Sequence, residues 1–278
     1  MQLGKYQKLE IIKKVEFGVY LAESRGEEER VLLPKAQVPV NAVIGDRIEV
    51  FLYRDSKDRM IATTARPKLT LGGLAALRVS QVGKIGAFLD WGLEKDLFLP
   101  YKEMKGKVRE GDEVLVTLYI DKSQRLAASM RHIYDLLLTD SPYQTGDTVK
   151  GRVYEFGHDY GTFVAVDDRY SAMIPRSEDA SDLRIGQVIE ARVTHVKEDG
   201  KLDISRRGTA VEQMDADAQK VLRVIDEFAG VLPFNDKASP EIIMRELQMS
   251  KAAFKRAVGH LYKQRLIEIT EKSIRRIK

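Results

Sequence analysis

The feature that most constrains the fold is a pattern of residues that the chain repeats three times. Each copy contains a bulky residue, a glycine, a small or β-branched residue, an aromatic and an aliphatic, at positions 17–21, 85–89 and 160–164. A proline and, eleven positions later, a glycine follow in each copy: Pro34 and Gly45, Pro100 and Gly111, Pro175 and Gly186. Self-similarity of this kind is the signature of a repeat architecture. The sequence therefore predicts a tandem array of one small module.

Within each copy, five segments have the composition of β-strands. Residues 47–52 alternate polar and apolar side chains, which is typical of a half-buried strand. The predicted strands are 6–15, 17–22, 29–34, 47–54 and 60–65 in the first copy, 74–84, 86–91, 96–100, 113–120 and 125–129 in the second, and 148–156, 161–166, 169–174, 188–195 and 201–205 in the third. A glycine in the second strand predicts a bend or bulge that closes a small barrel. A five-stranded Greek-key barrel of this size is the OB-fold, which binds oligonucleotides.

The last quarter of the chain changes from strand to helix periodicity. Apolar residues over 218–228 follow the spacing of an amphipathic helix. Ser239 and Pro240 are an N-cap and a first helical residue, and that helix is expected to end near 247. Ser250 caps a third helix, and residues 268–277 have the pattern of a β-hairpin. Three helices and a hairpin indicate a winged helix, a variant of the helix-turn-helix.

The predicted fold class is therefore mainly β, with three tandem five-stranded OB-fold barrels followed by an α+β winged-helix domain. A short helix over 132–138 is expected to join the second and third barrels. The predicted domains are residues 1–68, 69–134 and 143–208 for the barrels and 215–278 for the winged helix.

Charge and composition narrow the classes of partner. The chain has 46 Lys and Arg against 42 Asp and Glu, but residues 238–278 have 10 against 4, a local net charge of 10 − 4 = +6. Such an excess favours a polyanionic partner. The absence of cysteine excludes disulfides and thiolate metal sites. No apolar run approaches the ~20 residues that span a bilayer, and the N-terminus lacks the apolar segment of a signal peptide. We expect a soluble cytoplasmic protein, preferentially monomeric, with no membrane partner.

The motifs also resemble a known family. Residues 160–164, 172–178 and 200–205 resemble the ribosomal S1-type RNA-binding domain. Three such domains before a winged helix resemble the CvfB (conserved virulence factor B) family, and the similarity extends through segments 232–237, 239–241, 249–251 and 254–255. The resemblance covers essentially the whole chain. It implies a bacterial cytoplasmic RNA-binding protein that influences gene expression, with no enzymatic activity and no cofactor.

The resemblance also implies which residues contact RNA. In S1-type domains the contact patch consists of two aromatics on the second strand, a histidine ending the third, and an Asp and an Arg flanking the last hairpin. The matching residues are Phe17, Tyr20, Asp55 and Arg59 in the first copy, Phe88, Asp121 and Arg125 in the second, and Tyr160, Phe163, Lys197 and Lys201 in the third. Proline replaces the histidine in all three copies, and Ile85 replaces the first aromatic of the second copy. The second copy is therefore predicted to bind most weakly.

Each of these residues has a simpler interpretation. Aromatic rings in β proteins commonly fill the core, although a buried tyrosine needs a hydroxyl partner, which favours the surface for Tyr20 and Tyr160. Arg206 is expected to lie near Lys197 and Lys201 in the patch of the third copy. In the tail, a basic surface is predicted at Lys251, Lys255, Arg256, Lys263, Arg275 and Arg276, where phosphate contacts would dominate. The alternative is an ordinary solvated basic face, but the local excess of charge favours a nucleic-acid surface.

Two classes of function compete with single-stranded RNA binding. In one, the winged helix reads duplex DNA and the barrels act as spacers, which makes DNA a further candidate partner. In the other, the modules have lost RNA binding and form a protein-interaction scaffold. An enzyme is disfavoured because no segment remains for a catalytic domain. Asp167 and Asp168 are expected to form a turn rather than part of a metal site, and Trp91 is expected to pack against a neighbour.

Overall fold

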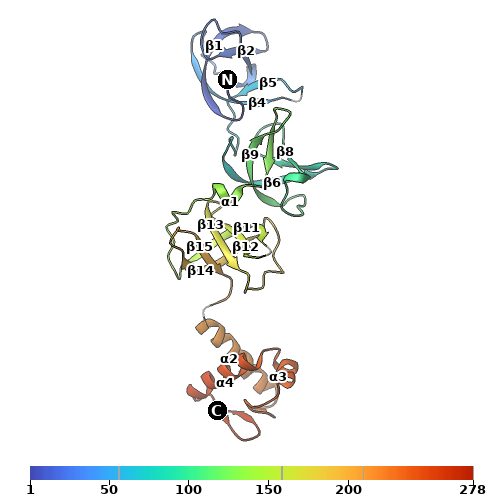
Figure 1. Ribbon diagram of the computed structural model, residues 1–278, viewed down its shortest axis with the longest axis vertical. Helices are drawn as coiled ribbons and strands as arrows, with labels where there is room; N and C mark the ends of the chain where they lie inside the picture. The colour runs from blue at the N-terminus through green and yellow to red at the C-terminus, as the bar shows by residue number, and fades with distance from the viewer. Residues whose placement is uncertain (56, 158, 209, 278) are drawn as a thin grey trace. The chain divides into compact units, whose positions relative to one another are not determined.

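The computed structural model describes residues 1–55, 57–157, 159–208 and 210–277, without the side chains of 210–213. The chain divides into two compact units, Met1–Arg206 and Arg207–Lys278. The first unit contains three five-stranded sheets, and the second contains three helices and a small sheet (Figure 1).

The first and third sheets are closed barrels with the same topology. The first consists of β1 (Tyr6–Val15), β2 (Gly18–Ala22), β3 (Val31–Pro34), β4 (Arg47–Arg54) and β5 (Met60–Thr63). The third consists of β11 (Thr148–Gly157), β12 (Gly161–Val166), β13 (Tyr170–Pro175), β14 (Val188–Val196) and β15 (Leu202–Ser205). The strand order is β1-β2-β3-β5-β4 in one and β11-β12-β13-β15-β14 in the other. In each, a parallel pairing of the third and fifth strands closes the barrel. The sequence predicted the closure but not this pairing.

The second sheet has the same strands but lacks the closing pair. It consists of β6 (Leu74–Val82), β7 (Gly86–Asp90), β8 (Leu97–Pro100), β9 (Glu113–Ile120) and β10 (Leu126–Ser129), in the order β10-β9-β6-β7-β8. All residues of this sheet are described, and β8 and β10 lie side by side without a ladder. In the other barrels the closing ladder comprises only one or two residue pairs, so a small separation is enough to remove it. The expectation of full closure is wrong for this copy alone.

The repeated glycine of the second strand is required by a close backbone approach. A Cβ added to Gly18, Gly86 or Gly161 would lie 2.2, 2.2 or 2.1 Å from the carbonyl oxygen that precedes the repeated proline on the adjacent strand. The expected bulge lies elsewhere. The first strand of each sheet has a register shift, between Ile11 and Lys13, Val79 and Gln81, and Val153 and Glu155, and β14 has a further one between Val193 and His195. The sequence thus identified the special glycine but attached the bulge to the wrong strand.

The second repeated glycine, eleven positions after each proline, turns the chain into the fourth strand. Gly45, Gly111 and Gly186 have φ values of +102°, +86° and +84°, a region that favours glycine. Their backbone N–H groups donate to the carbonyl oxygens of Ile11, Val79 and Val153 at 2.9, 2.9 and 2.8 Å. Each acceptor is the residue that directly precedes the bulge. The constant spacing of eleven residues therefore gives the loop the length it needs for its glycine to bond to the first strand just before the bulge.

A third repeated feature was not recognised in the sequence. The residue three positions after each proline holds the end of the last strand through its side chain. Gln37 Oε1 accepts from Thr63 Oγ1 at 2.6 Å, Glu103 Oε2 from Ser129 Oγ at 2.7 Å, and Glu178 Oε2 from Ser205 Oγ at 2.6 Å. The loop after the third strand is thereby tied to the end of the fifth.

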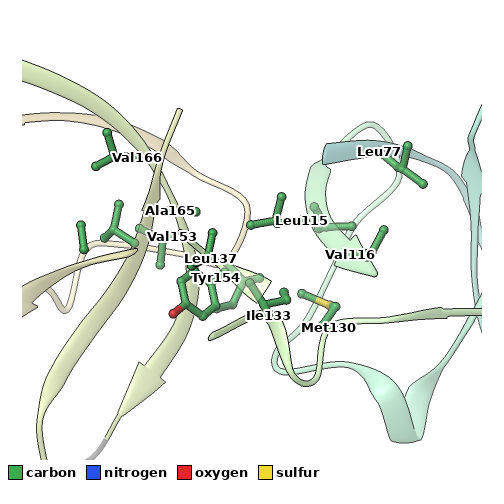
Figure 2. Packing of buried hydrophobic residues seen from close by; sticks show 14 of the residues in the cluster. Leu77, Leu115, Val116, Met130, Ile133, Leu137, Val153, Tyr154, Ala165 and Val166 are labelled. Carbon is green, nitrogen blue, oxygen red and sulfur yellow. The ribbon is translucent and has the colours of Figure 1, made fainter. Parts of the chain in front are cut away.

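The second and third barrels share one apolar core (Figure 2). The connecting segment contains α1 (Ile133–Leu136), and Ile133 and Leu137 are buried between Met130 on one side and Tyr154 of β11 on the other. The first barrel contributes Phe51 to the same cluster.

Two further contacts join neighbouring barrels. Phe51 packs edge-to-face on Trp91, with ring centroids 5.8 Å apart. Trp91 is only 3% exposed, which confirms that it packs against a neighbour. Arg152 of β11 is 7% exposed, and its guanidinium donates to Asp168 at 2.7 and 3.1 Å and to the Glu113 carboxylate at 3.3 Å. A buried cation is tolerated only when it is paired in this way.

The second unit is a winged helix. Its elements are α2 (Ala210–Glu227), β16 (Val231–Leu232), α3 (Pro240–Leu247), α4 (Lys251–Lys263), β17 (Ile267–Ile269) and β18 (Ile274–Arg276). The Oγ atoms of Ser239 and Ser250 accept from Ile242 N and Ala253 N at 3.4 and 3.2 Å, which confirms both predicted caps. The wing hairpin pairs with β16, a short strand that the sequence did not predict. In the described part of the chain, none of the helices combines the length and apolar character needed to span a membrane.

Replacing Gly161 by alanine should destabilise the first unit far more than replacing Gly146. Both glycines have positive φ, +140° and +103°, but a Cβ at Gly161 would overlap the Ile174 carbonyl, whereas one at Gly146 has no atom within 4 Å. We expect Gly161→Ala to lower the free energy of unfolding by at least ~2 kcal/mol more than Gly146→Ala, measured by urea denaturation. If both variants lost the same free energy of unfolding, β12 and β13 could move apart to accommodate the Cβ of residue 161 without destabilising the fold.

Candidate nucleic-acid interface

The strand register lines up one outward-facing residue from each of four strands. In the first barrel, Tyr20 pairs with Leu32, Leu32 with Ile61 and Ile61 with Tyr53. These four side chains are half-buried, whereas the adjacent Leu21 is fully buried in the barrel. The corresponding row of the third barrel is Phe163, Met173, Asp203 and His195. The second aromatic of each motif therefore lies on the outer wall rather than in the core.

The first residue of each motif is more exposed still. Phe17 is 58% exposed, Ile85 69% and Tyr160 71%. Each carbonyl accepts from the backbone N–H of the residue after the repeated proline, at 3.0 to 3.2 Å. Those residues, all exposed, are Lys35, Tyr101 and Arg176. Their constant position directly after the proline was the signal that sequence reasoning missed, and it adds a cation or a ring beside each motif.

The third barrel has a groove of about 730 Å³ on this wall. Tyr160, Phe163, Lys197 and Lys201, all predicted as contacts, line it together. Tyr134 of α1 lines it as well, although α1 lies outside the barrel. Its ring packs edge-to-face on Phe163, with centroids 5.9 Å apart. The groove is therefore built from two parts of the chain.

Both lysines of the groove are held by carboxylates. Lys197 Nζ lies 2.9 Å from Asp203 Oδ1, and Lys201 Nζ lies 2.6 Å from Asp199 Oδ2. The Lys201 ammonium also stands over the Tyr134 ring, 5.2 Å from its centroid. The hydrogen bond with Asp199 raises the pKa of Lys201 and lowers the pKa of Asp199. Lys201 is thus a fixed positive charge at the edge of an aromatic wall.

In the first barrel the predicted aromatic pair and the predicted charged pair are both formed. Phe17 and Tyr20 pack edge-to-face at 6.5 Å, and Arg30 lies over the Tyr20 ring at 5.2 Å. Asp55 accepts hydrogen bonds from Arg59 Nε and Nη2 at 3.0 and 2.7 Å. Burial alone would raise the pKa of Asp55, but these hydrogen bonds and those from backbone N–H groups hold it below its ordinary value. Asp55 therefore closes the β4–β5 hairpin and leaves the face of the Arg59 guanidinium exposed.

Residues of the first barrel contact the outer wall of the second barrel on which its predicted RNA-binding residues lie. Asp58, in the β4–β5 hairpin, accepts from Arg125 Nε and Nη2 at 2.9 and 3.1 Å. Arg54 Nε donates to the Gln124 carbonyl at 2.8 Å. Asp121 accepts from the backbone N–H groups of residues 123 and 125 and closes its own hairpin. The groove beside Phe88, about 320 Å³, is lined by residues of both barrels. Arg125 is thus already bound by a carboxylate along the Nε–Nη2 edge of its guanidinium.

Arg206 lies apart from the two lysines. Its guanidinium donates to the Asp182 carboxylate at 2.7 and 2.8 Å and to the Asp179 carbonyl at 3.0 Å. It follows the last residue of β15, whereas Lys201 precedes the first, so the two occupy opposite ends of the strand. The expected cluster is not formed, because Arg206 is held by the loop after β13.

In the winged helix, the predicted basic residues fall into two groups. Lys255, Arg256 and Lys263 of α4 and Arg275 of β18 are exposed, and Lys251 is half-buried. Arg276 pairs with Asp226 of α2 and braces the wing against that helix. The helix α4 is the second helix of the helix-turn-helix, the one that such folds present to nucleic acid.

The acidic pair and the histidines do not form a metal site within the described residues, which exclude His158. Asp167 and Asp168 both have φ of +54° and occupy the turn between β12 and β13, as expected.

Comparisons with known proteins agree with this architecture. An S1 domain model matches residues 3–65 and 71–131, the model for the second domain of the virulence regulatory factor CvfB matches 138–208, and a CvfB-like winged helix domain model matches 219–275. The fold is thus that of a tandem S1 protein with a C-terminal winged helix. The chain belongs to the CvfB family.

Individual relatives cover most of the chain. Conserved virulence factor B of Staphylococcus haemolyticus is 30% identical over 277 residues, which are 96% of this chain and 92% of that protein. The Staphylococcus aureus protein of the same name is 31% identical over 242 residues, 81% of this chain and 78% of that one. A crystal structure of a multidomain protein with nucleic acid binding domains from Streptococcus pneumoniae is 26% identical, with a TM-score of 0.57 and coverage of 99% of this chain and 98% of that chain.

The contact between Asp58 and Arg125 should be lost in acid. Hydrogen bonding to Arg125 lowers the pKa of Asp58, so the pair is fully formed above the ordinary pKa of the carboxyl group and breaks as the pH falls through the lowered value. We expect the Arg125 Nε–H resonance in NMR spectra to shift in that acidic range. Asp58→Asn should abolish the shift, whereas Asp90→Asn, which removes the exposed partner of Lys68, should leave it unchanged. A shift that persists in Asp58→Asn would contradict the pairing.

Proposed function

We propose that the protein is a non-enzymatic regulator of gene expression that binds single-stranded RNA on the outer walls of its first and third barrels. The groove of the third barrel carries the proposal, because exposed rings and fixed ammonium groups meet there. Tyr160 and Phe163 offer stacking surfaces for bases, and Lys197 and Lys201 offer charges for phosphates. The description of the pneumococcal protein as having nucleic acid binding domains supports the same class of ligand.

Single-stranded nucleic acid suits these surfaces better than a duplex. Stacking on an exposed ring requires a base that is free of its neighbours, and such bases occur in single strands, loops and bulges. The second barrel contributes least in this proposal, because Ile85 replaces a ring and because Tyr53, Arg54 and Asp58 of the first barrel line the groove beside Phe88. The winged helix adds phosphate contacts through Lys255, Arg256 and Lys263.

A second candidate is binding of duplex DNA by the winged helix. The exposed cations of α4 favour it, since helix-turn-helix proteins place this helix in the major groove. Basic residues on α4 without a defined set of base contacts would supply affinity rather than sequence specificity.

Removing the rings of the third barrel should weaken RNA binding in a folded protein. Each base stacked on an aromatic ring contributes ~1–3 kcal/mol, so Tyr160→Ala with Phe163→Ala should lower affinity for a single-stranded oligoribonucleotide by about tenfold or more. Ile85→Ala is the matched control, since Ile85 occupies the same position in the second barrel. Fluorescence anisotropy measures the affinities, and circular dichroism checks the fold. Unchanged affinity of the double variant would place the site elsewhere.

Unlabelled single-stranded RNA should compete with a bound, labelled RNA oligonucleotide more effectively than duplex DNA of matched sequence does. The affinity for single-stranded RNA should also depend strongly on salt concentration. About five phosphate contacts to a single strand give a slope of roughly −3.5 in a plot of log affinity against log salt concentration. Competition titrations at several salt concentrations test both statements. Tighter binding of the duplex would favour the second candidate, and a slope near zero would favour a protein-interaction scaffold.

A further inference from the structure

The groove of the third barrel differs from an ordinary stacking wall because a second segment closes one side of it. Tyr134 stands on α1, which precedes the barrel, and its ring contacts Phe163 of β12 edge-to-face. Tyr160 and Phe156, both exposed, line the same groove. The volume of this open groove, about 730 Å³, lies within the range of ~300–1,000 Å³ that holds small molecules. The groove of the second barrel is less than half as large.

The charges of the groove indicate the class of ligand. Aromatic cages alone suit cationic ligands, but here the Lys201 ammonium already stands 5.2 Å over the Tyr134 ring. Glu155 and Asp159 also line the groove, but they pair with Lys105 and Arg176, so Lys197 and Lys201 are the cations that an anionic group of a ligand would meet. The combination that fits is a flat aromatic group joined to an anion. The lysines pair with Asp203 and Asp199, so they are held at the groove before any ligand arrives.

We propose that this groove binds one nucleotide as a unit, with the base packed against Tyr134 and Tyr160 and the phosphate on Lys197 and Lys201. The inference rests on the proposed function and deepens it, since it assigns a defined nucleotide subsite to one barrel and gives Tyr134 a direct role. The nucleotide comes either from an RNA chain or from the free mononucleotide pool, because both present the same base and phosphate.

The α1 segment is suited to hold such a wall in place. Ile133 directly before Tyr134 is buried in the core that the second and third barrels share, and Leu137 anchors the other end of the turn. Tyr134 itself is 43% exposed and does not belong to the buried core, so its substitution changes the groove and spares the core. The groove is therefore preorganised, which lowers the cost of ordering a ligand.

The test uses the full chain and isothermal titration with AMP, UMP, adenosine and ribose 5-phosphate. We expect both nucleotides to bind more tightly than either fragment, and Tyr134→Leu to weaken nucleotide binding by about tenfold, as loss of one stacking surface implies. Tyr134→Phe should retain binding. Leu136→Ala, which removes an exposed side chain of the same segment that does not line the groove, is the matched control and should have no effect. Absence of nucleotide binding at millimolar concentration, or wild-type binding by Tyr134→Leu, would overturn the inference.

A parallel titration with a single-stranded oligoribonucleotide separates the two sources and the two proposals. If Tyr134→Leu weakens oligonucleotide and mononucleotide alike, the subsite accepts a nucleotide of an RNA chain. If only mononucleotide binding exists and depends on Tyr134, the subsite serves a free nucleotide and the proposed RNA function fails. If the oligonucleotide binds through Tyr160 and Phe163 but ignores Tyr134, the proposed function stands and this inference fails.

Discussion

The first unit depends on the apolar core that its second and third barrels share, with a buried guanidinium at its edge. Barrels of about 70 residues bury modest cores by themselves, and the shared cluster enlarges both. Arg152 limits how the barrels can rotate, because its charge must keep Asp168 and Glu113 as partners once it is out of water. The same core anchors α1, and α1 carries Tyr134. The geometry of the candidate site is therefore a consequence of how two barrels pack.

The three outer walls begin from one plan and differ through their neighbours. In each copy a glycine lets the second and third strands approach closely. The motif residues that follow face alternately inward and outward, because successive side chains of a strand point to opposite faces. In the second copy a carboxylate from the preceding hairpin binds Arg125. In the third copy Tyr134 of the preceding segment extends the wall into a groove. Tandem arrangement thus converts similar modules into surfaces with different properties.

Much of the fold could be predicted because its signals are local. Alternating polarity, turn glycines and helix caps each act over a few residues, and β1, β4, β9 and β12 have the bounds that these signals predict. The features that the sequence did not predict depend on pairing between strands that are far apart in the sequence. The strand β16 comprises two residues that are stabilised only by β18. The bulge was assigned to the glycine strand because a glycine is visible in a sequence, whereas a register shift is a relation between two strands.

The features of the candidate site also fall into those that local sequence predicts and those that depend on tertiary packing. The sequence by itself determined the number of modules, most of their strands and the surface position of Tyr160, since each follows from the spacing or the side-chain chemistry within one module. Only the tertiary structure decided which charges are already paired and which rings come together. Arg125 meets Asp58 across 67 positions of sequence, and Arg206 meets Asp182 across 24. Such encounters depend on how strands and barrels pack, and no short-range pattern encodes that packing.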